Sequence, residues 1–402
     1  MKKRVLVIGI NCLPELTGIG RYTGEMLEWL GEQGCETTMI TAFPYYPDWK
    51  VEKPYRNFFY RKESRSQLLS IYRCPLYVPA KPGGMKRMIH EATFFLSAFL
   101  VVCRLLFRKK YDLCMVVAPP FHLGFLGLFY RFFKGTPVHY HVQDLQIDAA
   151  KELKMLKPDW IFSILFALEK RILKKSDLVS TISEGMRKKL LAKVQRQVML
   201  FPNWVDTDLY FPVDHSGSLK SRWGFQPEDQ LVLYSGSIGE KQGLDALIRV
   251  ARELQSYPKI RLLICGTGPY KDHLVQAADD LENVYFFPLQ KKEVFNDFLN
   301  IATVHLVLQK KDASDLVMPS KLTTILAVGG LVLVTANEDT SLYDVITRYN
   351  IGVVIPPEDE TELKNAILDC CSKDYALERK RAREFAATAL NKEEILHQIF
   401  SR

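Results

Sequence analysis

The sequence predicts an α/β protein made of two domains, each a doubly wound parallel sheet flanked by helices. The chain has 402 residues, of which 48% are hydrophobic and 25% charged, a composition typical of globular proteins. A single core seldom grows to that length, so two domains of roughly 200 residues each are expected. Short apolar runs alternate with amphipathic stretches along the chain, and this alternation favours parallel strands connected by helices.

The apolar runs lack polar alternation, which is typical of strands covered by helices on both faces. We expect strands at 5–10, 37–41, 113–117, 138–141 and 178–182, and again at 231–234, 260–265, 284–287, 304–308, 331–335 and 352–355. An aromatic, proline-containing run at 201–212 separates the two series. The predicted organisation is a first domain at 1–202, a connector at 203–215, a second domain at 216–390 and a final helix at 391–402.

Composition excludes several classes of protein. The eight cysteines are scattered, without a CxxC pair or a Cys/His cluster, so neither a zinc site nor a disulfide framework is expected. The apolar run at 5–10 is too short for a signal peptide and has no cleavage site, so it is interpreted as a buried strand. A net charge of +8 fits an anionic partner without choosing among nucleotide, lipid headgroup and nucleic acid.

One stretch departs from the pattern. Residues 93–107 are apolar almost all round, and basic residues flank them at 86–87 and 108–110. We interpret the stretch as too short, and too interrupted by Arg104, to span a bilayer. A buried helix is the favoured interpretation. The alternative is a helix lying at a membrane surface, with its basic ends against anionic headgroups.

Loops at the carboxyl ends of parallel strands are the expected ligand sites in such sheets. The loop after the first strand contains Gly18 and Gly20 and leads into a helix expected at 22–30. Glycines at a helix start let backbone N–H groups approach a phosphate or sugar oxygen. A plain tight turn remains the alternative, because the full dinucleotide fingerprint is missing.

The first strand of the second domain is followed by a loop with a similar composition. It contains Gly236, Gly239 and Gly243 together with Lys241. A glycine-rich backbone and a lysine are suited to a departing diphosphate, whose negative charge grows during the reaction.

Two further segments of the second domain are candidate nucleotide contacts. Gly266 and Gly268 form a turn in which a base or ribose could lie against the main chain. Pro319 suits the first turn of a helix, and Ser320 and Lys321 would then offer a hydroxyl and a cation to phosphate. A capping serine and a solvated lysine are the alternative for the last two residues.

The chain resembles the family 4 glycosyltransferases of the GT-B fold, and within them the fucosyltransferases of colanic-acid-type exopolysaccharide assembly. That fold has two Rossmann-like domains facing each other across a cleft. The resemblance extends over nearly the whole chain, because the matching segments keep their order and spacing from the first strand to beyond residue 330. They lie at 9–11, 14–20, 73–79, 180–183, 201–204, 234–236, 238–244, 286–290 and 319–323.

The resemblance implies roles for individual residues. Lys241, Ser320 and Lys321 match positions that hold the donor diphosphate in such enzymes. Gly236, Gly239 and Gly243 match the donor loop, and Gly18 and Gly20 match the opposing loop of the first domain. The family's last helix commonly returns to the first domain, which we expect here of 391–402.

The chain also departs from the family pattern at two places. The pair of glutamates spaced eight apart is missing: Thr324 stands at the second position, beside the ribose, and the first falls near Asp315 or Leu316. Many relatives carry a histidine–aspartate pair after the strand at 138–141, where this chain has Gln143 and Asp144. His141 shares a strand face with Gln143 and could serve nearby, or it is a core histidine. Asp144, at the carboxyl end of the strand, is the stronger candidate.

The resemblance implies retaining transfer of a sugar, with GDP-fucose the favoured donor, onto a polyprenyl-diphosphate-linked oligosaccharide. Lys241 and Lys321 would stabilise the departing diphosphate, and Asp144 would orient hydroxyl groups. Neither a metal nor a cofactor beyond the nucleotide-sugar substrate is expected. The enzyme would work in the cytoplasm, peripherally on the inner face of the cytoplasmic membrane.

Three other functions were weighed. A family member using another GDP- or UDP-sugar is the main alternative. A nucleotide-sugar-modifying enzyme such as an epimerase would need a nicotinamide fingerprint, which neither domain has. A nucleic-acid-binding protein would need clustered basic and aromatic residues, whereas the basic residues of this chain are dispersed. Nucleic acid is therefore not an expected partner.

Overall fold

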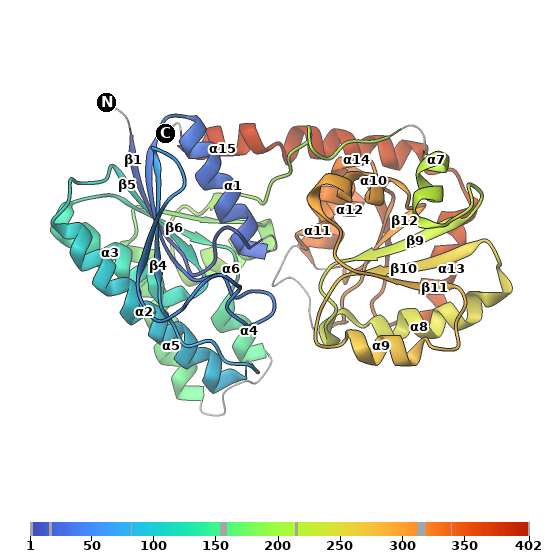
Figure 1. The fold of residues 1–402 in the computed structure, drawn as a ribbon, viewed down its shortest axis with the longest axis horizontal. Coiled ribbons are helices and arrows are strands. Elements are labelled where there is room, and N and C mark those ends of the chain that lie inside the picture. Colours follow the sequence, from blue (N-terminus) through green and yellow to red (C-terminus); the bar gives the residue numbers. More distant parts are fainter. Residues whose placement is uncertain are drawn as a thin grey trace. The chain divides into compact units, whose positions relative to one another are not determined.

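The structure is a computed structural model that describes residues 3–15, 18–81, 83–152, 159–213, 216–311, 319–338 and 340–400. The chain divides into two compact units, Met1–Pro202 (unit 1) and Asn203–Arg402 (unit 2). Each unit is a sheet flanked by helices (Figure 1), as the alternation of apolar runs predicts. The connector at 203–215 and the return of the last helix to the first domain stay predictions.

The sheet of unit 1 has eight strands in the order β3-β4-β2-β1-β5-β6-β7-β8. All of its pairings are parallel except that of β3 with β4 at one edge. The strands are β1 (Arg4–Ile8), β2 (Glu36–Ala42), β3 (Arg61–Ser64), β4 (Leu69–Cys74), β5 (Leu113–Ala118), β6 (Val138–Val142), β7 (Leu178–Thr181) and β8 (Met199–Leu200).

Helices α2, α3 and α5 lie side by side along one face of this sheet, and α1 lies on the other (Figure 1). Helix α1 begins at Gly18, a turn earlier than the sequence pattern predicts, so Gly18 and Gly20 belong to its first turn. The helices are α1 (Gly18–Glu32), α2 (Gly84–Leu106), α3 (Gly124–Lys134), α4 (Gln146–Glu152), α5 (Asp159–Lys175) and α6 (Glu184–Lys193), with a short helix η1 (Phe121–Leu123).

Helix α2 corrects one expectation. It has 23 residues, and within the described residues it is the one helix long and apolar enough to cross a membrane, although 44% of its apolar stretch is buried in the fold. The prediction that the stretch is too short was wrong because the helix begins nine residues before residue 93. Its inner face, which includes Phe94, Ala98 and Val102, is buried, whereas Leu96 and Leu100 are exposed.

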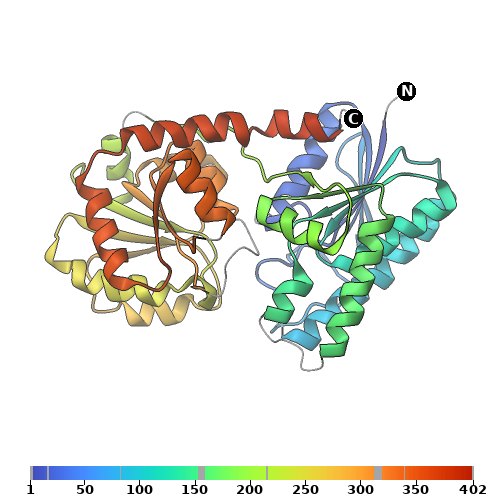
Figure 2. The same ribbon diagram turned by 180° about the vertical axis from the view of Figure 1, so that it is seen from behind.

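The sheet of unit 2 has six strands, all parallel, in the order β11-β10-β9-β12-β13-β14. Helices α13 and α14, red in the view from behind, lie against this sheet (Figure 2). The strands are β9 (Gln230–Ser235), β10 (Ile260–Cys265), β11 (Val284–Phe287), β12 (Val304–Val307), β13 (Val332–Thr335) and β14 (Gly352–Ile355). The helices are α7 (Ser216–Lys220), η2 (Ser221–Trp223), η3 (Glu240–Gln242), α8 (Leu244–Glu253), η4 (Leu254–Ser256), α9 (Lys271–Ala277), α10 (Lys292–Asn300), α11 (Lys321–Ala327), α12 (Ser341–Tyr349), α13 (Glu360–Ser372), α14 (Ala376–Ala389) and α15 (Lys392–Phe400).

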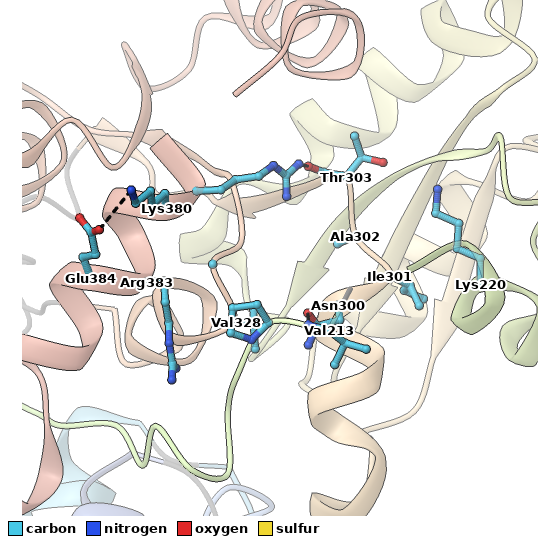
Figure 3. Close-up of a pocket in the computed structure, with 13 residues that line it drawn as sticks. Val213, Lys220, Asn300, Ile301, Ala302, Thr303, Val328, Lys380, Arg383 and Glu384 are labelled. Carbon is cyan, nitrogen blue, oxygen red and sulfur yellow. Dashed lines mark hydrogen bonds and ion pairs between the residues drawn. The ribbon is translucent and has the colours of Figure 1, made fainter. Parts of the chain in front are cut away.

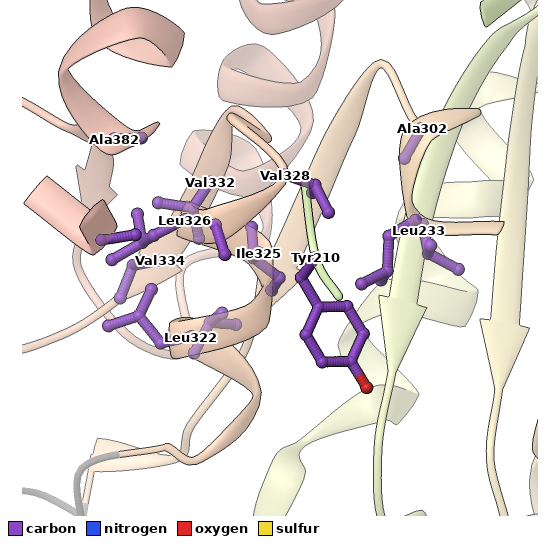
Figure 4. Close-up of a cluster of buried hydrophobic side chains, with 14 of the residues drawn as sticks. Tyr210, Leu233, Ala302, Leu322, Ile325, Leu326, Val328, Val332, Val334 and Ala382 are labelled. Carbon is purple, nitrogen blue, oxygen red and sulfur yellow. The ribbon is translucent and has the colours of Figure 1, made fainter. Parts of the chain in front are cut away.

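The strands of unit 2 bury both faces, as predicted from their unbroken apolar runs. Along β9, Leu231 and Leu233 contribute to one buried cluster, whereas Val232 and Tyr234 contribute to another on the opposite face. Side chains alternate between faces along a strand, so a helix layer is needed on each side. Figure 4 shows the first cluster, in which residues of α11 and β13 pack with Ala382 of α14 and with Tyr210, which precedes α7.

Each predicted strand run coincides with a strand of the structure, within a few residues at its ends. The analysis missed three strands of unit 1. β4 alternates buried and half-buried residues, and β3 is polar and largely exposed at the sheet edge. β8 has only two residues. None of the three has the long apolar run that marks a doubly covered strand.

The loops that follow β9 and β10 are joined through their main chains. Gly236 N–H donates to Cys265 O (2.9 Å) and Ile238 N–H donates to Thr267 O (2.8 Å). A Cβ atom at Gly266 would lie 1.9 Å from Gly236 O, and one at Gly268 would lie 2.1 Å from Ile238 O. The two glycines therefore make room for the neighbouring loop. That a base or ribose lies against this turn stays a prediction.

We expect Gly266→Ala and Gly268→Ala each to lower the free energy of unfolding of unit 2 by more than about 2 kcal/mol. The new methyl group would meet backbone that has no rotamer to change, at φ +159° and +156° respectively. Gly239→Ala is the control, because its φ is −127° and its Cβ would meet only the flexible Gln242 side chain. Urea unfolding followed by circular dichroism measures the effect. Equal stability of all three variants would contradict this account.

Candidate active site

Strand order locates one ligand-binding edge in each unit. Parallel sheets bind ligands at the carboxyl ends of strands, where the strand order reverses direction. In unit 1 this point lies between β1 and β5, and in unit 2 between β9 and β12. The glycine-containing segments after β1 and β9 both adjoin such a point, and so does α11, which follows β12.

Lys321 is the first residue of α11, and its ammonium group is buried at the carboxyl edge of the unit 2 sheet. Its ammonium nitrogen is inaccessible to solvent and has no hydrogen-bond partner among the described residues. It lies 3.7 Å from the centre of the Tyr234 ring, at the end of β9. The ring face offers a weak cation–π attraction but no counter-charge. Burial lowers the pKa of Lys321 to about 7.

The β9 loop lies directly against this lysine. A Cβ at Gly236 would stand 3.5 Å from Lys321 Cδ, and one at Gly243 would stand 3.3 Å from Lys310 Cγ. Both glycines have positive φ, +147° and +64°, which L side chains rarely adopt. Gly239 N–H donates to the Gln242 side chain (3.1 Å). The loop therefore presents mostly main chain beside one buried cation.

The predicted donor contacts Lys241, Ser320 and Thr324 differ in their surroundings. The backbone of Lys241 lies in η3, but its side chain is outside the described residues, as are residues 312–318 with Asp315 and Leu316. Ser320 directly precedes α11 and is half-buried. Thr324 is buried, and its hydroxyl donates to Lys321 O (3.0 Å). The hydroxyl is therefore bonded within its own helix, and a contact of Thr324 with the ribose stays a prediction.

At the unit 1 edge a buried carboxylate, missed by the sequence analysis, organises the loop after β1. Glu15 is 2% exposed. It accepts hydrogen bonds from the backbone N–H groups of Tyr45 (3.1 Å) and Tyr46 (3.0 Å) and from the Asn11 side chain (2.9 Å). A Cβ at Gly20 would stand 2.7 Å from its Oε2 atom. A glycine is therefore required at position 20, where α1 packs on this carboxylate. Burial raises the pKa of Glu15 to about 7.

Arg73, at the end of β4, is the second residue that the sequence analysis missed. Its side chain is fully buried. The guanidinium donates to Ala42 O (3.2 Å) at the end of β2 and to Leu13 O in the loop after β1, and it forms an ion pair with Glu63 at 3.4 Å. One buried cation therefore connects three segments at the carboxyl edge of unit 1.

Asp144 and His141 have different environments. Asp144 follows β6 and is half-buried at the carboxyl end of the strand, where a ligand contact is expected. His141 is 2% exposed within β6; its ring is 2.9 Å from Ser180 Oγ and packs against Phe201. Burial lowers its pKa well below the usual value. His141 is therefore a core histidine, and its candidacy for the chemistry is corrected.

A further polar group at the same edge surrounds the start of α2. Glu91 is buried, and both of its carboxylate oxygens accept from Gln146 Nε2, at 2.6 and 2.8 Å. The neighbouring His90 donates from Nδ1 to Tyr77 O (2.5 Å), and its ring packs edge-on against Tyr45. No sequence motif marks this group, because its members come from separate segments that together span 101 residues, from Tyr45 to Gln146.

No cluster of three or more His, Cys, Asp or Glu side chains suitable for a metal ion is found within the described residues.

Glu15→Gln should reduce the pH dependence of stability. Because the folded state raises the pKa of Glu15 from 4.5 to about 7, the folded chain holds more protons than the unfolded chain in that window. Stability should therefore be full below about pH 4.5 and fall by on the order of 3 kcal/mol as pH rises to 7. Glutamine stays neutral and should remove this fall.

Urea unfolding of wild type and the variant from acid to neutral pH measures the difference. Glu36→Gln is a control of opposite sign, because the Arg4 side chain lowers the pKa of Glu36. Parallel pH profiles of wild type and Glu15→Gln would show that folding leaves the pKa of Glu15 unchanged.

Two family models together cover most of the chain. Residues 17–204 match the Glycosyl transferase 4-like domain, and residues 217–389 match the Glycosyl transferases group 1. The "Putative colanic acid biosynthesis glycosyl transferase WcaI" of Escherichia coli (strain K12) is 37% identical over 410 residues, covering 99% of both chains.

Solved structures share the fold at lower identity. The sucrose-phosphate synthase of Thermosynechococcus elongatus aligns with a TM-score of 0.76 at 17% identity, covering 100% of this chain and 98% of that one. WaaG, a glycosyltransferase involved in lipopolysaccharide biosynthesis, aligns with a TM-score of 0.71 at 16% identity, covering 99% of this chain and 100% of that one. With two parallel-sheet α/β units and these relatives, the chain belongs to family 4 of the glycosyltransferases and has the GT-B fold.

Proposed function

We propose that this glycosyltransferase takes its sugar from a nucleoside-diphosphate sugar, whose diphosphate binds in unit 2 against Lys321. The observation that carries the proposal is the buried ammonium group of Lys321, which has no hydrogen-bond partner among the described residues. A buried charge without a counter-charge is costly. Phosphate oxygens would supply that counter-charge, and supply more of it as the bond to the sugar breaks.

The other residues have roles consistent with this chemistry. Lys241, in the β9 loop, is proposed to act with Lys321 on the diphosphate, and Gly236, Gly239 and Gly243 leave the main chain of that loop accessible. In unit 1, Asp144 is proposed to orient the acceptor or the sugar hydroxyls, with retention of configuration at the transferred carbon. Two ammonium groups can balance the charge of the leaving diphosphate, so the proposal includes no metal.

We further propose GDP-fucose as donor and a polyprenyl-diphosphate-linked oligosaccharide as acceptor, in the assembly of a colanic-acid-type polysaccharide. The relative WcaI, named as a putative glycosyl transferase of colanic acid biosynthesis, supports this choice of pathway. A UDP-sugar is the second candidate, because Anabaena HepE, with a TM-score of 0.70, was solved in complex with UDP-glucose.

Nucleotide release from a panel of GDP-, UDP- and TDP-sugars, with a lipid-linked oligosaccharide as acceptor, tests both choices. Acceptor-dependent release of GDP from GDP-fucose is expected. Release of UDP from a UDP-sugar, without release of GDP from GDP-fucose, would favour the second candidate. If the enzyme releases nucleotide from none of the nucleotide sugars in the panel, the proposal is contradicted.

Lys321→Met should lower the rate of transfer about a hundredfold, on the order of 3 kcal/mol of transition-state stabilisation. Methionine fills similar space without the charge, so the fold should be retained. Lys292→Met, an exposed lysine of α10, is the control and should keep the wild-type rate. A Lys321→Met enzyme with normal turnover would exclude this residue from the mechanism.

Binding of a nucleoside diphosphate should take up a proton. In the ligand-free protein the pKa of Lys321 is lowered to about 7, so at about pH 8 its amine is mostly neutral. A diphosphate bound next to this amine should favour its charged form. Phosphate groups are already ionised at that pH. Titration calorimetry of GDP in buffers of different ionisation enthalpy should detect the uptake, and affinity should fall as pH rises from 7. Uptake that persists in Lys321→Met would assign the proton to another group.

We also propose that the outer face of α2 and α3 binds the anionic surface of the cytoplasmic membrane. This face is defined by Leu96, Leu100, Phe107, Phe132 and Phe133, whose exposed fractions are 64%, 60%, 90%, 82% and 57%. Exposed apolar patches are unusual on a protein that has no partner there. Exposed basic residues follow α2 at 108–110, and their positive charges would attract anionic headgroups.

Changing Arg108, Lys109 and Lys110 together to serine should weaken binding to anionic vesicles, by roughly 1 kcal/mol for each charge. Transfer to a lipid-linked acceptor should slow, whereas transfer to a short soluble analogue should not. A matched variant removes three exposed lysines of unit 2, Lys259, Lys291 and Lys292. If the wild-type protein does not bind anionic vesicles at low salt, or if the two triple variants bind them equally well, the face does not bind membranes.

A further inference from the structure

Unit 2 contains a pocket of about 620 Å³ at the sheet edge opposite to Lys321. Thr303, directly before β12, contributes to its wall, and so do Val328 and Gly329, directly before β13 (Figure 3). These positions are at the amino ends of the parallel strands, whereas the donor loops are at the carboxyl ends. The pocket, here called the α14 pocket, is therefore separate from the proposed donor site.

The lining of the α14 pocket is strongly basic. It includes four cationic side chains, from Lys220 of α7 and from Arg379, Lys380 and Arg383 of α14, with Glu384 as the one acidic residue. Glu384 is 3.9 Å from Lys380, and both are largely exposed. Among the described residues, Lys220, Arg379 and Arg383 form no ion pair with a carboxylate.

The three unpaired cations donate to backbone oxygens instead. Lys220 donates to Pro227 O (3.0 Å) and Asp229 O (2.7 Å). Arg379 donates to Thr303 O. Arg383 donates to the backbone oxygens of Tyr210 (2.8 Å), Ala327 (2.7 Å) and Thr207 (3.2 Å).

Carbonyl oxygens satisfy N–H donors without cancelling a net charge. Arg379 uses one of the five N–H groups of a guanidinium in these bonds. Burial lowers the pKa values of both Lys220 and Arg379, which reflects the cost of holding their charges away from water, although nearby carboxylates act in the opposite direction. An anion bound among the three groups would offset the cost that remains.

We propose that the α14 pocket binds a small phosphorylated anion, held by Lys220, Arg379 and Arg383. Arginine presents a planar fork that matches phosphate oxygens. The pocket wall also has an apolar part, formed by Val213, Ile301 and Val328, against which an organic group of such a ligand would pack. The occupant would connect α14 with the segment at 212–213 and with the end of α10, and so stabilise unit 2.

Pyrophosphate and GDP are the probes, and calorimetric titration of the full chain carrying Lys321→Met is the measurement. That background removes one of the two proposed donor lysines, and the response to Arg379→Met separates binding in the α14 pocket from any binding that Lys241 still supports. Pyrophosphate should bind, and Arg379→Met should weaken it about tenfold or more. Arg381→Met is the matched control, because Arg381 is on the same helix but does not line the pocket. Tighter binding of GDP than of pyrophosphate would identify a nucleotide as the ligand, and the reverse order would identify an inorganic phosphate; either order supports the site.

Val213→Glu tests the same site without removing an arginine. A carboxylate in the pocket wall should abolish pyrophosphate binding and raise the melting temperature. The proposal is overturned if pyrophosphate fails to bind, or if neither Arg379→Met nor Val213→Glu weakens it. Asp214 is outside the described residues, so Asp214→Asn is included; binding that appears only in this variant would show that the chain supplies its own anion, which also overturns the proposal.

Discussion

Parallel strand pairing is the constraint on which the rest of this structure depends. Among the described strands only β3 pairs in the antiparallel sense. Parallel strands need a crossover between one strand and the next, so helices cover the sheets, and both faces of each strand must be apolar. The same pairing brings all carboxyl ends to one edge of a sheet. The segments that carry Lys321, Glu15 and Asp144 follow β12, β1 and β6, and each therefore lies at such an edge.

Buried charge distinguishes the two edges from each other. At the unit 1 edge, Arg73 and Glu15 have partners, and they fix loops to one another. At the unit 2 edge, Lys321 faces a tyrosine ring and has no hydrogen-bond partner among the described residues. A buried polar group whose hydrogen bonds are satisfied fixes the loops that it joins, whereas a buried charge without a partner favours binding of an ion of opposite sign. We infer that the first edge is largely organised before any ligand arrives, and that the second is completed by its ligand.

The sequence predicted the doubly covered strands because an unbroken apolar run records burial on both faces. It did not predict β3 or β4, since an edge strand and its neighbour lack that signature. Lys321 could be named in advance because it is local to a recognisable segment at 319–323. Its burial could not, since that depends on Tyr234, 87 residues earlier. Glu15 and Arg73 were missed for the same reason, because most of their partners lie in segments distant in the sequence. Thr324 and His141 were named from their positions in a family pattern, but neither has a side chain directed away from the core.

The direct main-chain contact between the loops after β9 and β10 has a consequence for how donor preference could change over evolutionary time. Gly266 and Gly268 admit no side chain without displacing Gly236 or Ile238, so those positions are closed to gradual substitution. Ser237 and Glu240 are exposed in the same loop and carry no such restriction. With the donor held by this loop as proposed, substitutions that alter sugar selectivity are expected at these two exposed positions rather than at Gly266 and Gly268.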